Sequence, residues 1–107
     1  MEDVVNVFLC RDGRDIQVSM LEYADAQRGF TDNVKINRYK RTVVVNGGWV
    51  TKFVSEPAYL DGMHIREITI STRMSTGGDI DKLTNMLNQA RKGRIAFQNS
   101  VIKKLRV

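Results

Sequence analysis

The stretch DIDKLTNMLNQARKG, residues 79–93, decides the predicted fold, because its apolar residues keep a helical period over several turns. These residues recur at spacings of three and four and form one stripe that must be buried: Ile80, Leu83, Met86, Leu87 and Ala90. Asp79 is placed to cap the first free amides, Asp81 lies in the first turn, and Gly93 supplies a left-handed exit. The sequence therefore predicts a helix over about 79–92 that covers one open face of a sheet.

The N-terminal part of the chain has the pattern of strands joined by a turn. Residues 4–9 form a nearly continuous apolar run, and apolar and polar residues alternate over 16–20. Between them, Asp12-Gly13 is typical of a tight turn, so the two segments are expected to form an antiparallel hairpin. Residues 21–30 fit neither a helical nor a strand period, and we expect a loop there, with room for one helical turn.

The middle of the chain predicts a second hairpin. Alternation over 34–39 changes to a solid apolar run over 43–45, which indicates either one strand that becomes buried or two strands that meet at a bend. The turn Asn46-Gly47-Gly48 then leads into a β-rich run over 49–54. Pro57 follows the end of that strand, since proline has no amide to give to a ladder.

The last part of the chain predicts a further strand and a closing hairpin. Over 63–70 the apolar alternation slips by one position near residues 66–67, which indicates a β-bulge or a change of exposed face. Residues 71–78 are interpreted as a polar connection into the helix, and 95–98 with 101–107 as the final hairpin. Strands joined by short turns are antiparallel. The expected architecture is therefore α+β, a mostly antiparallel sandwich or half-barrel of hairpins with the helix packed on the sheet.

Length and composition indicate a folded protein of one domain, residues 1–107. Hydrophobic residues make up 42% and charged residues 27% of the sequence, which argues against an intrinsically disordered chain. No apolar run approaches the roughly 20 residues that span a bilayer, and the opening MEDVV is acidic where a signal peptide is basic. We therefore expect a cytoplasmic protein with no membrane partner.

Charge is unevenly distributed along the sequence. Residues 1–32 carry seven acids and three bases, a charge of −4, whereas residues 33–107 carry fourteen bases and five acids, a charge of +9. Such a chain can present an acidic patch to the basic patch of a neighbouring copy, and head-to-tail contacts of this kind close into rings. Alternatively, the two parts neutralise each other within one fold.

Residues that support catalysis or metal binding are scarce. His64, the only histidine, lies in a strand-like segment where we expect it to face solvent, and with one cysteine the common zinc sets cannot be assembled. That cysteine, Cys10, lies in an apolar run where a buried inert thiol is expected. Gly77-Gly78 precedes the helix without a P-loop lysine-serine pair and is interpreted as a hinge. We therefore predict no catalytic residue, no metal and no cofactor.

Basic residues interleaved with aromatic residues indicate a binding surface. Paired strands that carry cations and exposed rings hold single-stranded nucleic acid in several small β-rich modules. The same rings also suit a small core, and lysines on strand faces and edges keep sheets soluble. Trp49 lies beside an exposed turn and is the type of residue that anchors protein interfaces. The candidate interaction residues are Trp49, Lys35, Arg38, Lys40, Arg41, Lys103, Lys104 and Arg106.

Residues 61–107 have a recognisable order of elements. The order is Asp61-Gly62, the strand REITIS at 66–71, a glycine-marked loop, the helix IDKLTNMLNQARKG at 80–93 and the basic-apolar return RIAFQNSVIKKLRV at 94–107. This order resembles the ring-forming tail and baseplate structural proteins of long-tailed bacteriophages. The resemblance implies a virion protein that forms a ring or collar and has no catalytic residues.

Two functions are therefore expected from the sequence. The first is a non-enzymatic structural protein of a phage tail or baseplate, which assembles with its own copies and with neighbouring virion proteins and is found in the virion. The alternative is a small nucleic-acid-binding β-rich module that uses the basic and aromatic strands around 35–53.

Overall fold

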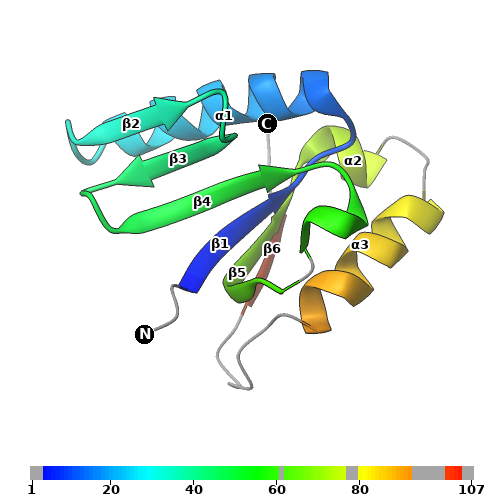
Figure 1. The fold of residues 1–107 in the computed structure, drawn as a ribbon. Coiled ribbons are helices and arrows are strands. Elements are labelled where there is room, and N and C mark those ends of the chain that lie inside the picture. The colour runs from blue at the N-terminus through cyan, green and yellow to red at the C-terminus, as the bar shows by residue number, and fades with distance from the viewer. Residues whose placement is uncertain (1–3, 61, 77–79, 93–100, 105–107) are drawn as a thin grey trace.

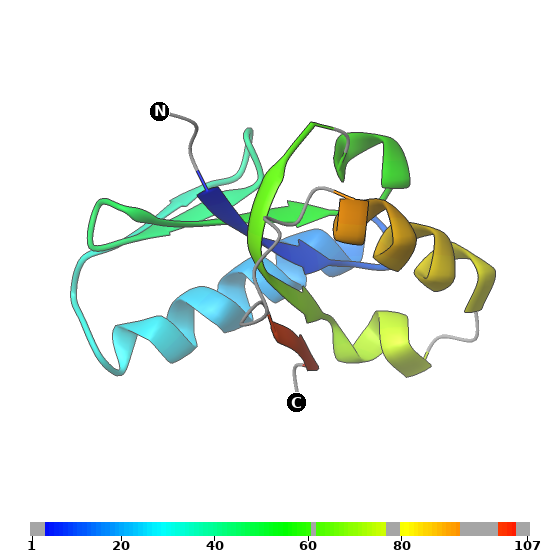
Figure 2. The same cartoon turned by 90° about the horizontal axis from the view of Figure 1, so that it is seen from below.

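The computed structural model of this chain describes residues 4–60, 62–76, 80–92 and 101–104. Six strands form one sheet, and two long helices pack on its opposite faces (Figure 1, Figure 2). In chain order the elements are β1 (Val4–Leu9), α1 (Gly13–Arg28), β2 (Val34–Asn37), β3 (Thr42–Val45), β4 (Trp49–Val54), the 3-10 helix η1 (Pro57–Leu60), β5 (His64–Ile70), α2 (Thr72–Thr76), α3 (Ile80–Lys92) and β6 (Val101–Lys104).

The sheet is mixed and has the strand order β2-β3-β4-β1-β5-β6. β2, β3 and β4 are antiparallel neighbours, whereas β1 runs parallel to both β4 and β5, and β5 runs parallel to β6. The predicted α+β class with a helix packed on the sheet is confirmed. The prediction of a mostly antiparallel sandwich or half-barrel is wrong where β1, β5 and β6 pair, because parallel neighbours need crossover connections, and α1 and the α2–α3 pair lie within them.

Helix α1 replaces the strand and the loop that were predicted over 16–30. The apolar residues that are fully buried on its inner side are spaced by four, as on one face of a helix: Ile16, Met20 and Ala24. Asp12 was expected in a hairpin turn but caps the helix instead, because its side chain accepts a hydrogen bond of 2.8 Å from the Asp15 amide. Val18, which completed the apparent strand alternation, is 39% exposed.

Two hydrophobic clusters lie on opposite faces of the sheet, because alternate side chains of β1 point to opposite sides. Val5, Val7 and Leu9 belong to the cluster that includes residues of α3, whereas Phe8 and Cys10 belong to the cluster that includes residues of α1. α1 contacts β2, β3 and β4, and Figure 1 shows it behind these strands. α3 contacts η1 and α2, so the two helices cover different parts of the sheet (Figure 2).

Helix α3 confirms most of the predicted apolar stripe. Four of its residues pack in one cluster with β1 and β5: Met86 and Ala90, which are buried, and Leu83 and Leu87, which are partly buried. Ile80 was expected in the same stripe but is 72% exposed, because it lies in the first turn, before the helix reaches the cluster. The predicted caps Asp79 and Gly93 lie outside the described residues.

The second predicted hairpin and the predicted bulge are both confirmed. β3 and β4 pair around the turn at 46–48, where two residues have positive φ. The preceding segment forms two antiparallel strands, β2 and β3, so the alternative of two strands holds. Val5 and Val7 of β1 pair with Ile65 and Ile68 of β5, so β5 holds one extra residue at the position where the alternation slips.

The end of the chain differs from the prediction. β6 confirms the strand predicted at 101–104 and pairs with β5 in parallel, whereas the other arm of the predicted final hairpin, at 95–98, lies outside the described residues. The predicted polar connection over 71–78 contains the short helix α2. The apolar and basic pattern of 101–104 predicts a strand, but its direction depends on the long crossover that precedes it.

Candidate functional site

Alternate residues of β2, β3 and β4 point to the side of the sheet opposite α1. In β2, Val34 and Ile36 pack toward α1, so Lys35 and Asn37 point to the other side. Figure 1 shows no described helix in front of β2, β3 and β4. We call this surface the basic face, and the strand register assigns to it Lys35, Asn37, Thr42, Val44, Val50 and Lys52.

An open pocket of about 410 Å³ lies at one end of the basic face, where the β2–β3 turn, the carboxyl end of β4 and η1 meet. Among the described residues, three cations, two tyrosines and three apolar residues line it, and none of these eight is acidic. Its volume is in the range of pockets that hold small ligands. The lining residues are Tyr39, Lys40, Arg41, Lys52, Phe53, Val54, Tyr59 and Met63.

The two tyrosines of the pocket keep much of their surface in water. Tyr39 is 88% exposed in the β2–β3 turn, and Tyr59 is 59% exposed in η1. Phe53 and Val54 are buried in the two hydrophobic clusters, so the apolar part of the lining is anchored in the core. The pocket therefore combines residues anchored in the core with two tyrosine rings that are exposed and can contact a ligand.

The turn that carries Tyr39 is held in one conformation by hydrogen bonds. Arg41 has a φ of 56°, and its carbonyl accepts a hydrogen bond of 2.9 Å from the Phe53 amide. The Asn37 side chain accepts a hydrogen bond of 2.9 Å from the Lys40 amide. A non-glycine residue in this region costs about 1–2 kcal/mol, so the surrounding contacts must hold the turn. These hydrogen bonds thus fix the backbone of the turn that carries Tyr39, Lys40 and Arg41.

The structure brings part of the predicted interaction residues together. Lys35 is exposed on the basic face, and Lys40 and Arg41 line the pocket. Arg38 is exposed in the same turn. The set of candidate residues did not include Tyr59, because only the fold brings η1 beside the β2–β3 turn, and a single aromatic residue after a proline gives no signal in the sequence.

The other predicted interaction residues lie away from the pocket. Trp49 shares a side of β4 with Thr51 and Phe53, which face α1. The Arg66 guanidinium lies 4.5 Å from the centroid of the Trp49 ring, a cation–π contact. Lys103 and Lys104 belong to β6, at the sheet edge opposite β2, and Arg106 lies outside the described residues.

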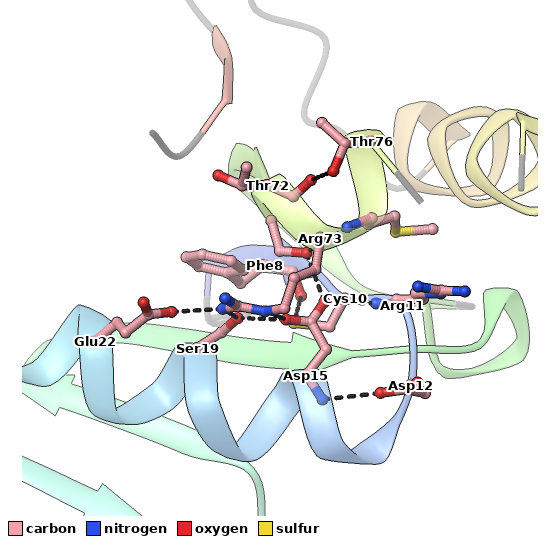
Figure 3. A network of polar contacts seen from close by, with 12 residues as sticks. Phe8, Cys10, Arg11, Asp12, Asp15, Ser19, Glu22, Thr72, Arg73 and Thr76 are labelled. Atoms are coloured by element: carbon pink, nitrogen blue, oxygen red, sulfur yellow. Dashed lines mark hydrogen bonds and ion pairs between the residues drawn. The ribbon is translucent and has the colours of Figure 1, made fainter. Parts of the chain in front are cut away.

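A second polar cluster lies where the carboxyl ends of β1 and β5 meet (Figure 3). Asp15 of α1 is 3% exposed. Its carboxylate accepts hydrogen bonds from the amide of Arg11, the hydroxyls of Ser19 and Ser71, and the guanidinium of Arg73, which also binds Glu22. Open α/β sheets bind ligands where the connections after two neighbouring parallel strands diverge, as they do here.

The hydrogen bonds of this cluster indicate a structural role. Burial raises the pKa of Asp15, but hydrogen bonds from Ser71, Arg11, Arg73 and Ser19 outweigh burial and hold that pKa below its ordinary value of 3.8. Both carboxylate oxygens are occupied, so Asp15 is not a free base. Its negative charge also fills the place where the amino end of α1 would attract an anion. The network ties α1 to α2.

The thiol of Cys10 lies beside this network and is fully buried. Burial, followed by the negative charge of Asp15, raises the pKa of the thiol, so the thiol stays protonated. A protonated, inaccessible thiol is a poor nucleophile and a poor metal ligand. The predicted burial of Cys10 is confirmed.

No metal centre in the described residues and no similar known protein indicates the function. Within the described residues, no group of three or more His, Cys, Asp and Glu side chains is placed to hold a metal ion, and no helix there is long and apolar enough to cross a membrane. His64, expected to face solvent, is partly buried in β5 and has an interaction partner. Comparisons with protein-family models, curated proteins and solved structures found no match. The resemblance to phage tail proteins stays a prediction.

Proposed function

We propose that this protein binds single-stranded nucleic acid on the basic face, with the pocket as its main contact. The observation that carries the proposal is the lining of the pocket, where Lys40, Arg41 and Lys52 lie beside two exposed tyrosines and no described lining residue is acidic. Cations neutralise phosphates, and aromatic rings stack on bases. These are the two components of sequence-tolerant strand binding.

The distribution of charge supports the same proposal. Lys35 and Arg38 are exposed and extend the positive surface beyond the pocket. Two acids of the N-terminal part, Asp15 and Glu22 of α1, are paired with Arg73 of α2. These acids do not reduce the charge of the basic face. A surface with one sign of charge attracts a polyanion and speeds its association.

Single strands suit this surface better than duplexes do. Rings such as those of Tyr39 and Tyr59 can stack on bases that are unpaired, whereas the bases of a duplex are already stacked and paired. The proposal therefore concerns unpaired DNA or RNA, held by its phosphates and by base stacking.

Fluorescence anisotropy with end-labelled single strands of DNA and RNA, and with a duplex of the same sequence, tests the proposal. We expect binding to single strands at low salt, with log K falling linearly as log salt rises, and weaker binding to the duplex. Failure of both single strands to bind at low salt would rule the proposal out.

Paired variants locate the binding surface. Lys40→Gln with Lys52→Gln removes two cations of the pocket, and Arg14→Gln with Arg91→Gln removes two exposed cations of α1 and α3. The pocket pair should lower the salt slope by about 1.4, because each lost contact to a single strand contributes about 0.7. The helix pair should leave the slope unchanged. Equal effects of the two pairs would contradict binding at the pocket.

A second candidate function is the assembly role expected from the sequence. Phe30 is 89% exposed and Ile80 is 72% exposed, and β2 and β6 are the edge strands of the described sheet. Exposed apolar side chains and strand edges are surfaces on which copies or neighbouring proteins assemble. Imaging of an assembled particle tests this role, and the absence of the chain from a virion would contradict it.

A further inference from the structure

We infer that the pocket admits one unstacked nucleobase of the bound strand together with a neighbouring phosphate. This inference rests on the proposed function and adds a requirement to it. Charge alone would hold any polyanion on the basic face. If the pocket holds a base, tight binding also requires a nucleobase at the bound position of the strand.

The first support is the pair of aromatic side chains. Tyr39 and Tyr59 line the same pocket from two different elements, the β2–β3 turn and η1, and both are more than half exposed. Met63 adds a partly buried apolar side chain to the lining. A planar base can therefore cover apolar and aromatic surface on entering the pocket, and such stacking raises affinity roughly 5- to 140-fold per base.

The second support is the set of cations in the same lining. Lys40 and Arg41 are neighbours in the turn, and Lys52 reaches the pocket from β4. Their charges match a phosphate that accompanies the base, and a guanidinium binds phosphate through two parallel hydrogen bonds. The lining therefore has surfaces complementary to both the base and the phosphate of a nucleotide. An inorganic phosphate or a neutral aromatic compound would contact only one of these surfaces.

The test compares two strands that differ only in their bases. An oligothymidylate and an abasic strand of equal length carry the same phosphates, and their affinities for the full chain are measured by competition at one low salt concentration. We expect the oligothymidylate to bind at least 5-fold more tightly, and 2-aminopurine placed in the strand to lose fluorescence when its base stacks in the pocket.

Aromatic variants assign the effect to the pocket. The double variant Tyr39→Leu with Tyr59→Leu should lose the preference for the oligothymidylate and keep the affinity for the abasic strand. Phe30→Leu is the matched control, because Phe30 is 89% exposed and does not line the pocket. Tyr39→Phe with Tyr59→Phe should keep the preference, since both rings remain. Thermal unfolding verifies that each variant is folded.

Each outcome decides a different statement. If neither strand binds, the proposed function fails and the inference fails with it. If both strands bind equally and their affinities fall steeply with salt, the proposed function stands and the nucleobase pocket is overturned. If the control variant loses the preference as the pocket variant does, a base is read elsewhere on the molecule and the inference is likewise overturned.

Discussion

Asp15 is the residue on which the contacts between α1 and α2 depend most. Asn in its place keeps the size of the side chain but removes the charge that binds Arg73. We expect Asp15→Asn to lower the free energy of unfolding by about 2–3 kcal/mol, less than for a fully buried ion pair because Arg73 is partly exposed. Urea unfolding followed by circular dichroism measures the change.

An acid on the same helix provides the control. Asp25 pairs with Arg28 at 3.2 Å, and both side chains are largely exposed. Asp25→Asn should therefore change the free energy of unfolding by less than about 0.5 kcal/mol. Similar losses in both variants would show that the network around Asp15 contributes no more than a surface ion pair.

The lowered pKa of Asp15 predicts how stability depends on pH. The pKa of this carboxyl in the folded protein lies below 3.8, its value in the unfolded chain, so the unfolded state binds the proton more readily. The stabilisation is complete above the unfolded pKa and is lost as pH falls through the folded pKa. The wild-type protein should therefore lose more stability than Asp15→Asn between pH 5 and pH 3, as urea unfolding at several pH values would measure. Parallel losses would contradict the prediction.

Part of the candidate site could be predicted from residues alone. Lys35, Lys40 and Arg41 stand out because they are interleaved with polar and aromatic residues in one strand region. The residues that complete each site come from distant parts of the chain. Arg73 reaches Asp15 across 58 positions, and Tyr59 joins the pocket through η1. No local pattern records such contacts, because they depend on how the elements pack.

Among the helices and strands, most strands were predictable from the sequence, whereas helix α1 was not. β1, β3 and β4 carry dense β-branched and aromatic residues, and the slip in β5 matches its bulge. In α1, Ile16, Val18 and Met20 alternate as a strand does, although only the first and third are buried. A five-residue window is too short to separate the two periods, whereas the buried Ala24 continues the spacing of four.

The parallel direction of β6 was not predicted from the sequence. Short turns imply antiparallel neighbours, but the chain between β5 and β6 holds two helices and returns to the same end of the sheet. Residues 101–104 were expected to pair with 95–98, and the crossover through α2 and α3 also brings them beside β5, a pairing that the sequence did not predict. Sequence patterns identify strands more reliably than they identify partners, because pairing is a tertiary property.

Helix α3 buries one residue of its apolar stripe and exposes another, which predicts unequal effects of two substitutions on stability. Met86 is fully buried in the cluster with β1 and β5, whereas Ile80 of the same helix is 72% exposed. Met86→Ala should lower the free energy of unfolding by about 2–5 kcal/mol, and Ile80→Ala should change it by less than about 0.5 kcal/mol. Chemical denaturation of both variants checks the contrast. A comparable loss in Ile80→Ala would mean that its side chain is covered in solution.

In the whole molecule, part of the opposite charge of residues 1–32 and 33–107 is neutralised within the fold. Asp15 and Glu22 from the acidic part pair with Arg73 from the basic part, so some charge is neutralised within the fold. The cations of the pocket have no acidic neighbour among the lining residues that the structure describes. Five of the fourteen bases of residues 33–107 lie on the basic face or in the β2–β3 turn: Lys35, Arg38, Lys40, Arg41 and Lys52. This group of cations is the basis for the proposed binding of a polyanion.

Amide chemical shifts measured during titration with a single-stranded oligonucleotide test the binding surface most directly. The largest shifts should fall on residues 35–41 and 50–54 and on Tyr59 and Met63. Because Gly13 lies beside the Arg41 guanidinium, α1 should remain unperturbed only beyond its first turn. Shifts concentrated on α1 or around Trp49, or an unchanged spectrum at low salt, would contradict binding on the basic face.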